Sequence, residues 1–201
     1  MSNNENQNQE EFIDFCRKLS ELWNSAPFAN LLEKAENDLL ETKSLKEFEI
    51  LDKKDDGYGI YCFWIKQEKL EDLEDFRKDW NKSKGKLALT QPTEKWYAGN
   101  ELIANSEGKA LRPFYMGKRE KVLNRIKQHA FESSISTYGL HLYRDEKKWQ
   151  ENIEFSYFLL PKDGIKAITS VGTKGKHLQQ LILTFLESSL REKFNPMIGK
   201  Q

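Results

Sequence analysis

A short aromatic and β-branched run at residues 58–65 constrains the fold of this chain more than any other segment. It reads YGIYCFWI, so apolar side chains stand at both the odd and the even positions. Successive side chains of a strand point to opposite faces of a sheet, so both faces of this strand must be covered. The run therefore predicts a central strand.

Hydrophobic periodicity predicts helices and two further strands around this run. Two amphipathic stretches precede it, and Pro27 separates them, as expected at a first helical turn. The expected fold class is α+β, with a small three-stranded, mostly antiparallel sheet flanked by helices and an N-terminal helical extension. The expected helices lie at 10–23, 28–40, 67–80 and 177–194, and the further strands at 113–116 and 153–160.

The length of 201 residues suits one domain with an appended helical arm. Residues 1–10 are mostly Asn, Gln and Glu, which predicts a disordered leader without the apolar region of a signal peptide. We expect the helical extension at 11–50 and the main domain at 51–201. Between the first two strands, residues 66–112 form an expected insertion.

The charge balance excludes a strongly basic nucleic-acid binder, because 32 Lys and Arg residues face 32 Asp and Glu residues. Any surface that binds nucleic acid must therefore be a local patch. No apolar run approaches the roughly 20 residues that span a bilayer. Cys16 and Cys62 lie among apolar residues, which predicts buried free thiols in a reducing compartment such as the cytoplasm. The cysteines and histidines lack the spacing of a zinc site.

A basic stretch at 119–129 follows Gly117, which is expected to turn the chain into a helix. Lys121, Arg125 and His129 are spaced at i, i+4 and i+8, so they fall on nearly one helix face. A phosphate at the start of such a helix would meet free backbone N–H groups and a favourable dipole. The alternative interpretation is a solvated basic face on an amphipathic helix.

The C-terminal helix carries one isolated carboxylate, Glu187, among leucine, isoleucine and phenylalanine. Leu183 and Leu190 flank it at i−4 and i+3, so the carboxylate is expected to be largely buried. A buried carboxylate is costly unless it is paired or bound to a cation. A metal ion is one possible partner, and an ion pair with Arg191 at i+4 is the other.

Taken together, these residues resemble the GIY-YIG nuclease superfamily. The glycine-Ile-Tyr strand of the family is matched by Gly59-Ile60-Tyr61, and the second motif by Tyr115-Met116-Gly117. The family arginine, ten residues after the second tyrosine, falls on Arg125, and the histidine of restriction-type members falls on His129. The family's metal-binding glutamate and the lysine of its repair-type members fall on Glu187 and Lys118. The likeness covers about residues 57–129 and 153–200.

The resemblance implies a Mg²⁺-dependent DNA endonuclease of restriction or mobile-element type, acting on double-stranded DNA, in which Mn²⁺ can substitute. Glu187 would hold the metal ion, with waters and phosphate completing its coordination. Arg125 would clamp the scissile phosphate, and Tyr115 would position the water or the phosphate. Tyr61 would accept a proton from water if nearby cations such as Lys118 favoured its phenolate. His129 would relay a proton.

The substrate would also be bound by basic side chains near the second motif. Lys118, Arg119 and Lys121 are the expected contacts to the DNA backbone, so affinity should fall as salt rises. The two N-terminal helices and the insertion at 66–112 are the expected source of base contacts or of a homodimer surface. Acidic helices such as 68–79 are expected to face away from DNA.

Two departures from the family pattern leave alternatives open. Tyr61 and Tyr115 are 54 residues apart, whereas the family usually joins its motifs by a short hairpin. Gly199 stands where the family often has asparagine, which leaves Asn195 or Lys200 to supply the polar contact. One alternative is therefore a nuclease-fold nucleic-acid-binding module that has lost cleavage. The other is a helical protein-interaction domain in which the motifs are coincidental.

Overall fold

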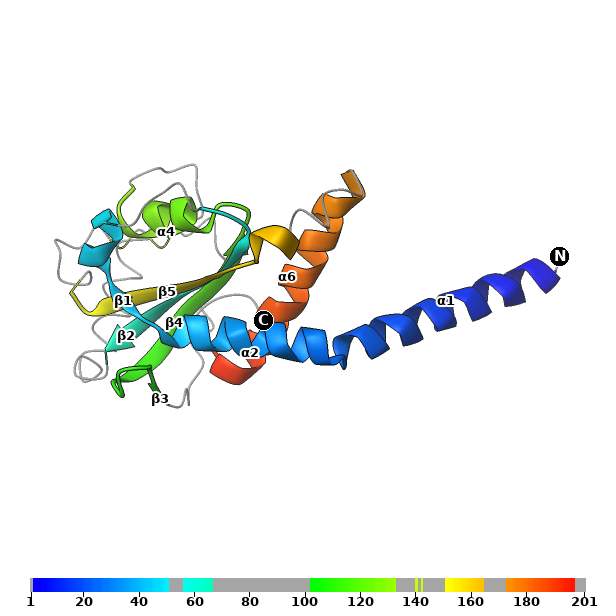
Figure 1. Cartoon of the computed structure of the whole chain (residues 1–201), viewed down its shortest axis with the longest axis horizontal. Coiled ribbons are helices and arrows are strands. Elements are labelled where there is room, and N and C mark those ends of the chain that lie inside the picture. Colours follow the sequence, from blue (N-terminus) through cyan, green and yellow to red (C-terminus); the bar gives the residue numbers. More distant parts are fainter. Residues whose placement is uncertain are drawn as a thin grey trace, which may run out of the picture. The chain divides into compact units, whose positions relative to one another are not determined.

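The chain forms two compact units in a computed structural model, Met1–Lys34 and Ala35–Gln201. Helix α1 (Ser2–Trp23) and most of helix α2 (Ala26–Leu40) belong to the first unit, and a sheet with its helices belongs to the second (Figure 1). None of the helices in the described part of the chain is long and apolar enough to cross a membrane. The structure describes residues 2–50, 56–66, 102–132, 140, 142, 151–164 and 173–197.

The first unit differs from the expectation at its start. Helix α1 begins at Ser2, so the segment predicted to be a disordered leader is helical in this structure. Trp23, at its end, stacks on Phe28 of α2 with ring centroids 4.7 Å apart. Cys16 is a free thiol but exposed, so the prediction that it is buried was wrong. Its apolar neighbours Phe12 and Phe15 are exposed as well, so a helical apolar stripe did not imply burial here.

The second unit is built on a five-stranded antiparallel sheet with the order β1-β5-β2-β4-β3. The α+β class is confirmed, and the three long strands correspond to the predicted ones. Two edge strands of two residues each were missed, because so short a strand has no hydrophobic period to detect. The strands are β1 (Lys43–Ser44), β2 (Gly59–Lys66), β3 (Ile103–Ala104), β4 (Ala110–Arg119) and β5 (Ile153–Leu159).

Strand β2 is central, as predicted, and every residue from Gly59 to Ile65 is buried. It pairs with β4 on one side and β5 on the other. A side chain at Gly59 would place its Cβ only 1.9 Å from the backbone oxygen of Phe158 in β5. The first glycine of the sequence motif is therefore required by the close approach of two strands.

Strand β4 is longer than predicted at both ends. It begins at Ala110, and β3 precedes it, so the end of the predicted insertion belongs to the sheet. Pro113 fits in the strand because β3 pairs only with Ala110 and Leu111, and a proline needs an unpaired edge. Gly117 lies within β4 and does not turn the chain into the helix. The helix predicted at 67–80 lies outside the described residues.

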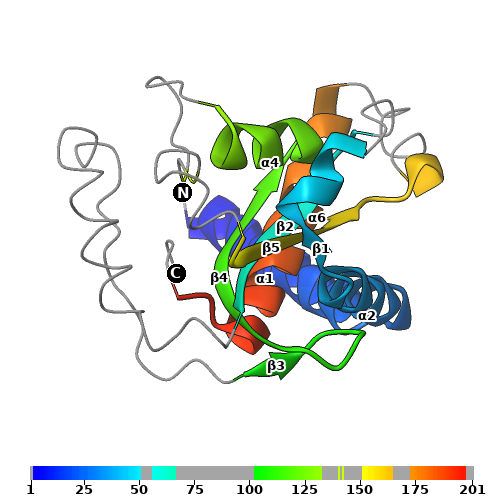
Figure 2. The same cartoon turned by 90° about the vertical axis from the view of Figure 1, so that its left-hand side faces the viewer.

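Helices α4 (Val122–Ala130) and α6 (Thr173–Phe194) pack on opposite faces of the sheet. On the α4 face, Phe63 lies edge-on to His129, with centroids 5.6 Å apart. The next residue along β2, Trp64, points the other way and lies edge-on to Phe194 of α6 at 5.5 Å. In Figure 2, α6 (orange to red) passes behind the strands.

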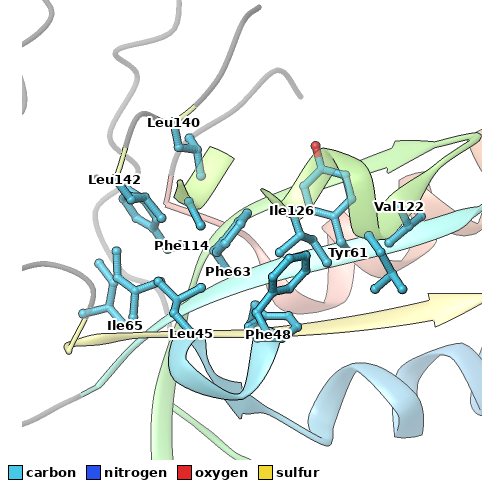
Figure 3. Packing of buried hydrophobic residues seen from close by; sticks show 14 of the residues in the cluster. Leu45, Phe48, Tyr61, Phe63, Ile65, Phe114, Val122, Ile126, Leu140 and Leu142 are labelled. Carbon is cyan, nitrogen blue, oxygen red and sulfur yellow. The ribbon is translucent and has the colours of Figure 1, made fainter. Parts of the chain in front are cut away.

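The core on the α4 face extends to the segment before β2. The 3₁₀ helix η1 (Leu45–Ile50) places Phe48 edge-on to Phe155 of β5. Ala35 and Leu39 of α2 are fully buried, and β1 pairs with β5. Residues 35–50, which the sequence placed in the helical extension, therefore lie in the same compact unit as the sheet. Figure 3 shows many of the buried apolar side chains that make up this core.

Gly59→Ala should lower the free energy of unfolding by about 3 kcal/mol, the upper range for an overpacked core, since β2 and β5 must separate. Urea denaturation measures this change. Gly57→Ala is the matched control, because nothing lies within 4 Å of a Cβ at that position. Equal stability of the two variants would show that the strands are not as close as described.

Candidate active site

Tyr61, Tyr115 and His129 meet on the α4 face of the sheet. The Tyr61 hydroxyl lies 2.9 Å from Nε2 of His129, and both side chains are buried. The Tyr115 ring lies 6.1 Å from the Tyr61 ring and 5.3 Å from the imidazole, measured between centroids. Tyr115 is only half-buried. Figure 3 shows the Tyr61 ring among apolar side chains, with its hydroxyl pointing away from Phe48 and Ile126.

The imidazole of His129 is held in one tautomer by the backbone. The amide N–H of Leu140 donates to Nδ1 at 2.7 Å, so Nδ1 is an acceptor. In a neutral imidazole the proton is then on Nε2, which donates to the Tyr61 hydroxyl; this assignment follows from the hydrogen bonds. A backbone amide cannot pass its proton on. The geometry therefore does not support the predicted proton relay through His129, which acts here as a fixed donor.

The Tyr61 hydroxyl is a neutral phenol in this environment. Burial raises its pKa well above the usual value, and Tyr115 raises it further, while the charge of Arg125 and its hydrogen bond lower it. The predicted stabilisation of a phenolate is therefore outweighed. A guanidinium can only donate, so the oxygen accepts from Arg125 and His129 and has its own proton left for Tyr115.

Gly117 makes room for this hydroxyl. A Cβ at Gly117 would lie 2.6 Å from the Tyr61 oxygen and 2.8 Å from its ring carbon. Gly117 is directly opposite Tyr61 in the pairing of β4 with β2. The glycine of the second motif is thus tied to the tyrosine of the first by direct steric contact.

Helix α4 positions Arg125 and His129 but not Lys121. Arg125 is 7% exposed, and its Nη1 donates to Oε1 of Gln128 at 3.0 Å. Lys121 is the exposed N-cap residue, with no side-chain capping bond. The predicted common face therefore holds for Arg125 and His129 alone, because Lys121 precedes the first helical residue.

The N-terminus of α4 has no free N–H group for a phosphate in this structure. The carboxylate of Asp56 accepts from the amides of Leu123 at 2.8 Å and Asn124 at 3.0 Å. The amide of Val122 donates to the Gly57 oxygen at 3.2 Å. The expectation that a phosphate would meet free N–H groups at this terminus was therefore wrong. Sequence reasoning missed Asp56 because it precedes the helix by more than sixty residues and carries no local capping signal.

Glu187 lies on the opposite face of the sheet, between two cations. Its Oε2 is 2.8 Å from the ammonium of Lys118, and its Oε1 accepts from Nε of Arg191 at 3.0 Å. Nη2 of Arg191 also donates to the backbone oxygen of Met116 in β4. The ion pair with Arg191 that the helix spacing suggested is confirmed, and Lys118 is a second partner that it did not suggest.

The predicted site residues therefore form two clusters, separated by the sheet. The phenol cluster consists of Tyr61, Tyr115, Arg125 and His129, and the carboxylate cluster of Lys118, Glu187 and Arg191. Strand β4 links them, because Gly117 lies against the Tyr61 hydroxyl on one face and the next residue, Lys118, points to the other face. The expectation that the Lys118 side chain lies beside Tyr61 was wrong, since neighbours in a strand point to opposite faces.

A divalent cation would have only one carboxylate in the carboxylate cluster. Across the part of the chain that the structure describes, no three His, Cys, Asp or Glu side chains form a group that could hold a metal ion. Mg²⁺ accepts one carboxylate when waters and a substrate phosphate supply the other ligands. In this structure, Lys118 and Arg191 occupy the two oxygens of that one carboxylate, so a metal ion would have to displace one of them.

Other predicted contacts lie around these clusters. Arg119, at the end of β4, is exposed, like Lys121. Asn195 follows α6 with a positive φ of 45°, and its backbone N–H donates to the backbone oxygen of Arg191 at 2.8 Å. Gly199 and Lys200 lie outside the described residues.

Comparison with known proteins identifies no relative: no family model, no curated protein and no solved structure matches this chain.

Gly117→Ala should destabilise the fold by about 2 kcal/mol, because the new methyl group displaces the Tyr61 phenol from its partners. Chemical denaturation gives the stability, and near-UV circular dichroism reports the tyrosine environment. Gly164→Ala is a control, since its Cβ would meet nothing within 4 Å. An unchanged tyrosine spectrum in Gly117→Ala would contradict the contact.

Stability should also depend on the ionisation of Tyr61 in alkaline solution. The unfolded phenol ionises near pH 10 while the folded one stays neutral, so stability falls as pH rises above about 10, by about 1.4 kcal/mol per pH unit. Tyr61→Phe lacks this component and should show a shallower decline, although it is less stable at neutral pH. Parallel slopes between pH 10 and 11, from denaturation at each pH, would refute the raised pKa.

Proposed function

We propose that this chain is a metal-dependent endonuclease that hydrolyses phosphodiester bonds in double-stranded DNA. The observation that carries the proposal is that Tyr115, Arg125 and His129 converge on one buried hydroxyl. That hydroxyl belongs to Tyr61 in β2, and its partners come from β4 and α4. The carboxylate cluster on the opposite face of the sheet supplies the carboxylate that the proposal uses. The GIY-YIG likeness of the sequence motifs provides the reaction type.

Arg125 would neutralise the scissile phosphate, since a planar guanidinium matches two phosphate oxygens. Its present bonds to Gln128 and Tyr61 orient it. A cation bound at Glu187 would supply charge neutralisation at the leaving oxygen. Exposed Arg119 and Lys121 would contact the DNA backbone.

Tyr115 would hold the attacking water, because it is the half-buried member of the phenol cluster. Tyr61 donates its proton toward Tyr115 and thereby orients the Tyr115 hydroxyl. A proton transfer from water to Tyr61 would require Tyr61 to lose its own proton first, which its raised pKa opposes at neutral pH. Tyr61 and His129 are therefore positioning residues in this proposal, and Tyr115 is the group nearest the reaction.

A nuclease-fold module that binds nucleic acid without cleaving it is the second candidate. Two observations favour it: both oxygens of Glu187 are occupied by cations, and Tyr61 is a neutral phenol. Such a module would keep the basic side chains and their salt-sensitive binding.

Purified protein should nick or linearise supercoiled plasmid in Mg²⁺ or Mn²⁺ and not in EDTA. Arg125→Ala and Glu187→Ala should each lower the cleavage rate at least ~100-fold, the usual effect of removing one electrostatic stabiliser. Glu192→Ala, an exposed carboxylate on the same helix, should cleave normally. Wild-type rates in the Arg125 or Glu187 variant would overturn the site, and salt-sensitive binding without cleavage would establish the second candidate.

A further inference from the structure

Helix α1 carries large apolar side chains that face water. Phe12 is 66% exposed, Phe15 is 56% exposed and Leu22 is 59% exposed. Leu19 lies between them in the sequence and is half-buried. A single apolar residue at a surface needs no explanation, but a contiguous group on one helix marks an interaction site.

The spacing of these four residues is that of a coiled-coil seam. They follow one another at intervals of three, four and three residues, so they occupy the a and d positions of a heptad. Such a stripe pairs with an identical stripe, because each side chain fills a hole between residues of the facing helix. Most of a helix's stability in a protein comes from packing of its apolar face, so this pairing would also stabilise α1 itself.

The charges on α1 favour a second copy of the helix over a membrane surface. Residues 10–23 include four acidic and two basic side chains, whereas helices that lie on anionic lipid are rich in Lys and Arg. Both basic residues, Arg17 and Lys18, pair with Asp14 within the helix. The helix is therefore unsuited to an anionic lipid surface.

A parallel arrangement of two copies keeps like charges apart. Glu11 and Lys18 occupy the g positions beside the seam, and Cys16 and Trp23 occupy the e positions. In a parallel pair each g residue faces the next e residue of the other helix, so neither charge meets another charge. An antiparallel pair with the same apolar contacts would place Lys18 against Lys18 of the second copy.

The exposed area suits a weak dimer. A covered phenylalanine buries about 150–250 Å², so Phe12 and Phe15 each leave roughly 100 Å² open. With the two leucines, pairing would remove roughly 700 Å² of apolar surface from water. Since about 60% of an interface is apolar, the whole contact would cover roughly 1,200 Å², the lower limit for specific association. We therefore expect a dissociation constant in the micromolar range.

We propose that α1 pairs with α1 of a second copy of this chain in a parallel coiled coil, with the four apolar residues at its seam. The inference goes beyond the proposed function and does not rest on it, because association needs neither DNA nor a metal ion. A chain that dimerises without cutting plasmid would refute the nuclease alone, and a chain that cuts as a monomer would refute the pairing alone.

Sedimentation equilibrium of the full chain tests the pairing. The wild type should pass from monomer to dimer as its concentration rises through the micromolar range. Phe15→Glu and Leu19→Glu should each stay monomeric, because the new carboxylate would be buried at the seam. Ile13→Glu is the matched control, since Ile13 is 59% exposed on the same helix but lies off the seam, and this variant should dimerise like the wild type.

Three results would overturn the inference. They are a wild type that is monomeric throughout, a dimer that survives both seam substitutions, and a dimer that Ile13→Glu disrupts as strongly as they do. If the seam variants do not fold, the wild type still provides a test, because Cys16 is exposed and Cys62 is buried, so a spin label attaches at Cys16. Pairing predicts a short distance between the two labels, and its absence would refute the pairing.

The orientation has its own measurement. In a Cys16→Ser background, a spin label at Glu10→Cys lies at the same height on both helices of a parallel pair and gives a short distance. In the antiparallel pair the two labels would be offset by about 14 residues along the axis, or roughly 20 Å. The longer distance would refute the parallel arrangement.

Discussion

The burial of strand β2 on both faces is the constraint on which the rest of the structure depends. Its residues from Gly59 to Ile65 lose contact with water, so β4 and β5 must satisfy its backbone on both edges, and helices must cover both faces. Burial raises the pKa of the Cys62 thiol in the same strand, so that thiol stays protonated. Gly59 permits the required closeness to β5.

A polar group within this buried strand creates the phenol cluster. The Tyr61 hydroxyl would be costly in the core without partners, and His129, Arg125 and Tyr115 satisfy it. Two of these partners are held in turn: His129 by the Leu140 amide and Arg125 by Gln128. The same contacts that stabilise the core thus pre-organise the groups that the proposed reaction uses, which is why fold and site are difficult to separate here.

Much of the fold could be predicted from the sequence, because its strongest signals are local. Apolar residues on both faces identified β2 as central, and the helical spacing of 177–194 identified most of α6. The isolated Glu187 suggested a buried carboxylate and offered Arg191 as its partner. The edge strands and the exposure of Cys16 were missed, since each depends on contacts with residues distant in sequence.

The sequence by itself determined which residues are available: two tyrosines paired with two glycines, an arginine and histidine one helical turn apart, and a carboxylate with a cation at i+4. Only the tertiary structure decided how they are grouped. It separated Lys118 from Tyr61 across the sheet, paired it with Glu187 and placed Asp56 at the start of α4. These outcomes depend on strand register and helix packing, which bring together groups that no sequence spacing relates.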